Sequence, residues 1–180
     1  MSGYLCTTCG KQHEELPMCF GPRAPDLWYS IPEAEREERG ELSSDQCVID
    51  GKYFFVLGRI LIPVVDGPGP FIWLAWVSLS EANVLRTCEL WESEGRETEP
   101  PYFGWLQNAL PYEPTTLNLK IQLQTMPLGE RPNIVLEKTT HPLSVEQRLG
   151  IKMARVQKIA EAALHGEVDA QPFHREDVSG

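Results

Sequence analysis

Hydrophobic and polar residues are arranged along this chain in patterns that predict β-strands. Residues 117–124 place Leu or Ile at every second position, with Asn, Lys or Gln between them, which is the period of two expected for a half-buried strand. Two longer apolar stretches, 53–65 and 71–78, are rich in aromatic and β-branched residues and predict strands as well. Asp50-Gly51, just before the first stretch, predicts a hairpin turn.

Three further positions add detail to these strands. Gly58 predicts a bulge or a bend in the first long strand, since glycine weakens a regular ladder. Trp73 and Trp76 fall on opposite faces of the second, so we expect at least one of them to be exposed. Residues 133–138 predict another strand after a turn.

Helical signals lie between the strands and after them. Residues 32–40 begin with Pro, continue with acidic residues and end with Gly, a pattern typical of a short helix. Ser80 is a candidate N-cap for a helix that reaches Trp91. The segment from Pro142 is amphipathic at helical spacing and is interrupted by Gly150, which predicts two helices. Its expected buried face consists of Val145, Leu149, Val156, Ile159, Ala160 and Ala163.

The order of these elements predicts the fold class. The segment Tyr102 to Leu110 is expected to be helical or irregular, and the rest follows the order strands, helix, strands, helix. Because no regular strand–helix–strand alternation occurs, we expect an α+β fold with a mainly antiparallel sheet. The C-terminal helical segment is expected to pack on one face of that sheet, with Val156, Ile159 and Ala163 against the strand at 117–124. We expect one domain over residues 1–166 and a flexible tail over 167–180.

The charge and the cysteine content limit the partners and the cellular compartment that we expect for this protein. The chain has 180 residues and a formal net charge of −10, which disfavours nucleic acid and anionic membranes as partners. Its N-terminus lacks the basic and apolar regions of a signal peptide, and no apolar run approaches the roughly 18 residues of a membrane span. We therefore expect a cytoplasmic protein. Five cysteines, an odd number, argue against a disulfide framework in that compartment.

The strongest chemical signal lies in residues 1–22, which are rich in Cys, Gly and Pro and predict a zinc knuckle. Cys6 and Cys9 are two residues apart and are followed by Gly10, so both thiolates can bind one metal across a tight turn. We predict a zinc site formed by Cys6, Cys9, His13 and Cys47. Cys19 and His141 compete for the last two positions.

The number of ligands separates the possible roles of this metal. Four protein ligands make a closed, structural site, which would order a segment that has little core of its own. Three ligands and a water would allow a metal-dependent hydrolase that uses Asp45 or His141, although the favoured roles are a turn carboxylate for Asp45 and a helix cap for His141. A third interpretation is a redox pair of Cys6 and Cys9.

Aromatic and basic residues suggest where a partner could bind. Residues 100–105 form an aromatic segment, and the polar side of the neighbouring strand carries Asn118, Lys120 and Gln122. Together they predict a shallow surface for a protein or a small ligand. Arg59 and Arg131 either bind an anion or pair with the surplus carboxylates, and pairing is favoured.

The chain also resembles a bacterial family known as domain of unknown function 2199. The resemblance implies one full-length domain of a small bacterial protein and implies no activity. We therefore expect an uncharacterised zinc-containing module that binds a protein or a ligand without catalysis, with the hydrolase as the alternative. The resembling stretches are CTTCGKQH, LSSDQCVID, FFVLGRILIPV, WLAWVSLSE, PPYFGWLQNALP, LNLK, RPNIVLE and HPLSVEQRLGI.

Overall fold

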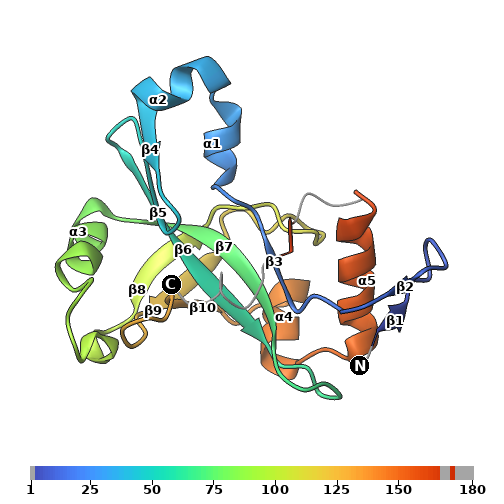
Figure 1. Ribbon diagram of the computed structural model, residues 1–180. Coiled ribbons are helices and arrows are strands. Elements are labelled where there is room, and N and C mark those ends of the chain that lie inside the picture. The colour runs from blue at the N-terminus through green and yellow to red at the C-terminus, as the bar shows by residue number, and fades with distance from the viewer. Residues whose placement is uncertain (1–2, 167–170, 173–180) are drawn as a thin grey trace.

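Five strands close into a barrel at the centre of the computed structural model, which describes residues 3–166 and 171–172 (Figure 1). Four of the five pairings are antiparallel, and the fifth, between the last strand and the first, is parallel and joins Asn133 to Arg59. The mixed α+β class and the mainly antiparallel sheet predicted above are confirmed. The barrel strands are β6 (Tyr53–Ile62), β7 (Phe71–Leu79), β8 (Tyr102–Leu106), β9 (Lys120–Gln124) and β10 (Asn133–Leu136).

Shorter strands extend the sheet on both sides of the barrel. On one side β6 pairs with β5 (Gln46–Ile49), and β5 pairs with β4 (Gly40–Leu42). On the other side β7 pairs in parallel with β3 (Cys19–Gly21), which in turn pairs with β11 (Gln171–Pro172). Of the tail predicted over 167–180, residues 171 and 172 thus form an edge strand, and the others lie outside the described residues.

Two of the helices begin at the N-caps that the sequence predicts, but the helix after Ser80 ends at Glu89 and does not reach Trp91. Ser80 Oγ accepts a hydrogen bond from Asn83 N at 3.2 Å, and His141 Nδ1 accepts one from Leu143 N at 3.1 Å. Gly150 has φ +82° and separates the last two helices. The helices are α1 (Asp26–Ser30), η1 (Glu33–Glu35), α2 (Arg36–Arg39), α3 (Glu81–Glu89), η2 (Arg96–Thr98), α4 (Pro142–Leu149) and α5 (Met153–Leu164). No described helix has the length and apolar character that a membrane crossing requires.

Two glycines allow barrel strands to approach each other closely. The predicted bulge at Gly58 is wrong, because the β6–β7 register runs without interruption from Leu57 through Arg59. A Cβ atom at Gly58 would instead lie 2.8 Å from Ile134 Cγ1 of β10, the strand that closes the barrel. At Gly104 of β8 a Cβ atom would lie 2.5 Å from the backbone oxygen of Ser78 in β7. Both positions therefore lack a side chain because a neighbouring strand occupies the space.

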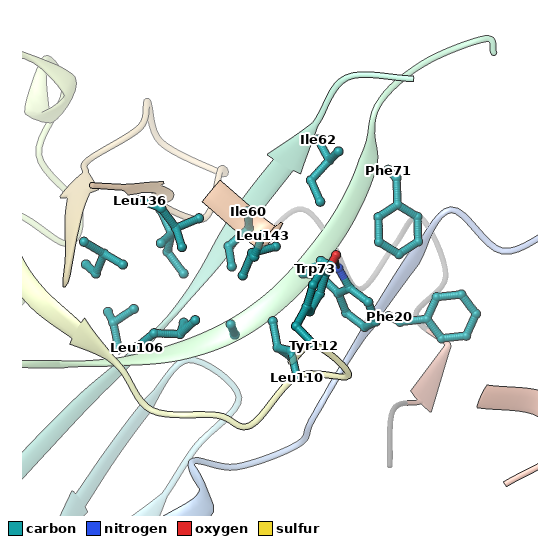
Figure 2. Close-up of a cluster of buried hydrophobic side chains, with 14 of the residues drawn as sticks. Phe20, Ile60, Ile62, Phe71, Trp73, Leu106, Leu110, Tyr112, Leu136 and Leu143 are labelled. Carbon is teal, nitrogen blue, oxygen red and sulfur yellow. Dashed lines mark hydrogen bonds between the residues drawn. The ribbon is translucent and has the colours of Figure 1, made fainter. Parts of the chain in front are cut away.

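Strand β7 is buried on both faces, so the expectation that Trp73 or Trp76 is exposed is wrong. Trp73 lies in the main core cluster and is 0% exposed, whereas Trp76 lies in a second cluster and is 1% exposed. Figure 2 shows Trp73 beside Tyr112, and the Trp73 Nε1 atom donates a hydrogen bond to the Tyr112 hydroxyl at 3.0 Å. The second cluster is covered by half-buried side chains of α1, Leu27 and Trp28. The barrel interior buries one face of β7, and this second cluster buries the other.

Two local predictions need correction. Residues Tyr102–Leu106 form a strand rather than a helical or irregular segment, with buried and exposed residues in strict alternation. Leu149, predicted on the buried face, is 70% exposed because α4 ends there, and Leu143 and Ser144 are buried in its place. Ile121 and Leu123 are buried as their alternation predicts, in the same cluster as Val156, Ile159 and Ala160 of α5.

Candidate metal centre

The N-terminal hairpin, Tyr4–His13, positions the candidate metal ligands. Its strands β1 (Tyr4–Leu5) and β2 (Gln12–His13) are antiparallel, and Tyr4 pairs with His13. The connecting turn is closed by two backbone hydrogen bonds of 2.9 Å, from Cys6 N to Lys11 O and from Gly10 N to Cys6 O. Gly10 has φ +69°, a left-handed conformation that glycine adopts without steric cost. Cys6 and Cys9 consequently lie on one turn, with His13 after it.

Three of the four predicted ligands come together on this hairpin. The ligand atoms of Cys6, Cys9 and His13 all lie within 4.8 Å of one another. Cys9 Sγ is 3.6 Å from His13 Nε2. Two thiol sulfurs and one imidazole nitrogen form the donor set that Zn²⁺ prefers, and separations of this size suit ligands about 2.0–2.3 Å from a common ion. These residues can hold a zinc ion.

A second histidine, just after the C-terminal helix, lies beside one of these three residues, Cys6. His165 follows α5 directly, and its Nε2 atom lies 3.2 Å from Cys6 Sγ. In Figure 1 the hairpin of β1 and β2 lies beside α5. His165 is therefore within reach of a metal bound at Cys6.

A buried carboxylate fixes the hairpin to α5 one turn before His165. Glu161 is 5% exposed, and its Oε1 atom accepts hydrogen bonds from Thr7 N at 2.7 Å and from Gln157 Nε2 at 2.8 Å. The Thr7 hydroxyl donates to the other oxygen. These bonds, led by the one from Gln157, lower the pKa of Glu161 to about 2. The carboxylate thus holds the Cys6–Cys9 turn against the helix in its ionised form.

Cys6 is prepared for metal binding by its surroundings. Burial opposes ionisation of this thiol, but hydrogen bonds from the Cys9 backbone N–H, the His165 ring and the Thr8 backbone N–H lower its pKa to about 6. The thiolate is the form that binds metals. Below this turn, the ring of Tyr4 stacks on that of His13 with centroids 5.2 Å apart.

The structure does not bring Cys47, the fourth predicted ligand, to this group. Cys47 lies on β5 and is 1% exposed, packed with Phe55 and Trp76 in the second core cluster. Burial raises its pKa to about 12, so the group remains a neutral thiol. Cys19 is buried on β3 in the same cluster. The apolar surroundings of Cys47 suit an uncharged thiol.

The two suggested catalytic residues also lie elsewhere. The carboxylate of Asp45 forms an ion pair with Arg131, which agrees with the favoured pairing of that arginine. His141 caps α4 through Nδ1, while its Nε2 atom lies 2.8 Å from the Pro114 carbonyl oxygen. The contacts that these two side chains make, Asp45 with Arg131 and His141 with Pro114 and Leu143, involve no residue of the N-terminal hairpin.

The predicted aromatic surface is the outer face of β8 and β9. Phe103 and Trp105 are 45% and 38% exposed, and their rings meet edge to face with centroids 5.2 Å apart. The strand register places Gln122 beside Phe103 and Lys120 beside Trp105. The polar and aromatic residues therefore share one exposed face, although they come from two strands rather than from a strand and a loop.

Comparison with protein families adds one finding. The model of an uncharacterised protein family conserved in bacteria, DUF2199, matches residues 5–151. The chain belongs to the DUF2199 family. The matched region of DUF2199 includes Cys6, Cys9 and His13 and ends before α5, which carries Glu161. No curated protein and no solved structure matches the chain.

Two residues at this centre were missed by the sequence analysis. Glu161 and His165 lie in or next to a helix whose other residues follow an amphipathic pattern. Glu161 could have been noticed from the sequence. It lies in the last turn of its helix, where a negative charge interacts unfavourably with the helix dipole, so its presence there indicates another role. His165 carries no comparable local signal.

Proposed function

We propose that this member of the DUF2199 family is a non-catalytic binding module whose N-terminal hairpin is held in place by one structural zinc ion. The ligands in this proposal are Cys6, Cys9, His13 and His165. The observation that carries it is the meeting of three hairpin ligand atoms within 4.8 Å with the His165 nitrogen 3.2 Å from Cys6 Sγ. Four protein ligands from two segments would form a closed tetrahedral site.

A structural role fits the position of the hairpin. Among the described residues its two strands pair only with each other, as a separate two-stranded sheet, and isolated hairpins are at best marginally stable in water. Metal binding supplies folding free energy that so small a sheet cannot supply by burial. Zinc bound by thiolates also agrees with the reducing cytoplasm proposed for this protein.

Metal analysis of the purified protein tests the proposal. Protein prepared without chelators is expected to contain one zinc per chain, and Cys9→Ser is expected to lose it. Cys88→Ser is the matched control, because Cys88 is an exposed thiol on α3 outside the metal group. Cys47→Ala is also expected to keep its zinc. Protein without zinc, with Cys6 and Cys9 joined in a disulfide that reforms after reduction, would instead support a redox pair.

Cobalt substitution distinguishes four protein ligands from three. Tetrahedral Co²⁺ with two thiolates and two imidazoles gives visible absorption bands that shift when one imidazole is replaced by water. We expect His165→Ala to shift these bands and to weaken cobalt binding by about 10-fold or more. An unchanged spectrum in His165→Ala would remove His165 from the ligand set and leave a site with an open position.

A further inference from the structure

A pocket unrelated to the metal centre lies where one edge of β6 changes its partner strand. Val56 pairs with Gln46 of β5, whereas Arg59, further along β6, pairs with Asn133 of β10. The pocket opens at this change of partner, between β6, α3 and the loop that leads from β9 to β10, and its volume is about 110 Å³. The mouth of a β-barrel is a common position for a small-molecule site.

The charged side chains that line the pocket are all engaged. Asp45 forms an ion pair with Arg131, and Glu130 forms one with Arg59. The Arg96 guanidinium donates to four backbone oxygens at 2.8 to 3.1 Å. The described lining thus contains two carboxylates and two guanidinium groups, so its formal charges sum to zero. A charged ligand would lose hydration here without meeting a free countercharge, so the pocket favours a neutral ligand.

The rest of the lining is mainly apolar and suits a single ring. An engineered apolar cavity of about 150 Å³ binds benzene, so this smaller pocket, which is open to solvent, can hold most of such a ring and leave a substituent outside. Two lining residues, the 45% exposed Trp91 and Met126, are of types that contact aromatic rings favourably. The other main apolar lining residues are Leu57 of β6, Leu90 after α3 and Leu123 of β9.

We propose that this pocket binds a neutral molecule with one aromatic ring. The ring packs against Leu57, Leu123 and Met126, and a small uncharged polar substituent points to solvent at the entrance beside Trp91. The proposal goes beyond the zinc site, because the two sites share no residue. Its test does not depend on whether zinc is bound.

Titration with three ligands of one skeleton tests the proposal. Benzyl alcohol, benzoate and benzylammonium share a ring and a one-carbon substituent and are neutral, anionic and cationic at about pH 7. The protein as purified, with ¹³C-labelled methionine methyl groups, is titrated with each. We expect a saturable shift of the Met126 methyl signal with benzyl alcohol, with a Kd below about 5 mM, and at least about 10-fold weaker binding of both ions. A weaker Kd for benzyl alcohol, or a smaller loss for either ion, would overturn the proposal.

Contacts within the parent complex locate the ligand without any variant. We expect nuclear Overhauser effects between the ring protons of benzyl alcohol and the Met126 methyl group. Effects to the methyl groups of Met18 or Met153 alone would place the ligand outside the pocket and overturn the proposal.

A pair of variants on α3 gives a second location. Thr87 lines the pocket, so Thr87→Phe adds a ring to its wall and should weaken benzyl alcohol binding by at least about 10-fold. Leu85→Phe is the matched control, because Leu85 lies on the same helix, is 56% exposed and is not part of the lining. It should keep the parent affinity. Equal affinities of the two variants would overturn the proposal, and the measurements on the parent decide it if Thr87→Phe does not fold.

Discussion

Single buried groups set the most specific constraints in this molecule. Glu161 is one of few buried charged residues, and it connects the last helix to residues near the start of the chain. Its pKa is lowered to about 2, which means that the fold stabilises the ionised carboxylate of Glu161 more than the protonated carboxylic acid. Because a depressed pKa stabilises the fold above the pKa of the unfolded chain, this contribution is complete above about pH 4.5 and is lost as the pH falls toward 2.

We therefore expect Glu161→Gln to lower the melting temperature at pH 6, and the difference from the parent to shrink as the pH is lowered from 4.5 toward 2. Thermal melts across this range measure the effect. Glu41→Gln, at an exposed position of β4, is the control and should leave the melting temperature nearly unchanged. A difference between Glu161→Gln and the parent that stays constant down to pH 2 would contradict the ionised role of Glu161.

Neighbouring residues of β9 are expected to differ sharply in their tolerance of substitution. Ile121 is 1% exposed, and Ile121→Asp should lower the free energy of unfolding by about 3–5 kcal/mol because it buries a charge without a partner. Lys120 is exposed on the opposite face, and Lys120→Ala should cost less than about 0.5 kcal/mol. Urea denaturation measures both. Equal losses would mean that both faces of β9 are buried in solution.

At the scale of secondary structure, the sequence predicted elements best where one face is polar. β9 alternates apolar and polar residues, so both the strand and its buried face could be identified. β8 also alternates between buried and exposed residues, but the alternation is not visible in its sequence. Phe103 and Trp105 on the exposed face are aromatic like Tyr102 on the buried face. The composition of residues 102–106 therefore predicted an irregular aromatic segment, and the strand is identified only by its pairing with β7 and β9.

Close strand packing makes Gly104 sensitive to the smallest substitution. Gly104→Ala would place a methyl group 2.5 Å from the Ser78 backbone oxygen, and β8 cannot move away without losing its pairing. We expect a loss of about 1–3 kcal/mol in the free energy of unfolding.

Gly69→Ala is the matched control, because no atom lies within 4 Å of a Cβ at that position. Its effect should stay within about 0.5 kcal/mol. Equal stability of the two variants in urea denaturation would show that β7 and β8 separate more easily than their packing indicates.

At the scale of the whole molecule, contacts between distant parts of the chain could not be predicted from local patterns. The α+β class followed from the order of elements, but barrel closure depends on a parallel pair between β10 and β6 that begins at Asn133 and Arg59. The candidate metal ligands likewise include some that a local pattern predicts and one that it does not. Cys6, Cys9 and His13 share a short segment with recognisable spacing, whereas His165 is 159 positions from Cys6 and no spacing rule links them.

Removal of the metal is expected to loosen one part of the molecule and leave the rest folded. Hydrogen exchange of amides in the N-terminal hairpin should become at least about 10-fold faster when zinc is chelated, because the hairpin then loses the crosslink that the metal provides. Amides of β6 and β7 should keep their protection. If chelation accelerates exchange equally in the hairpin and in the barrel, zinc supports the whole fold rather than the hairpin alone.

The burial of both faces of β7 has a consequence for the chain before it is folded. Phe71–Leu79 is a nine-residue strand without a charged residue, the kind of segment that forms intermolecular β-structure when exposed. The strands β8, β9 and β10 that complete the barrel around it are all synthesised later. During translation this segment is therefore exposed until those strands are made. Pro70, directly before it, and Glu81, two residues after it, are of the types that act as gatekeepers against aggregation. Slow synthesis or truncation before residue 136 should therefore lead to aggregates rather than to a soluble intermediate.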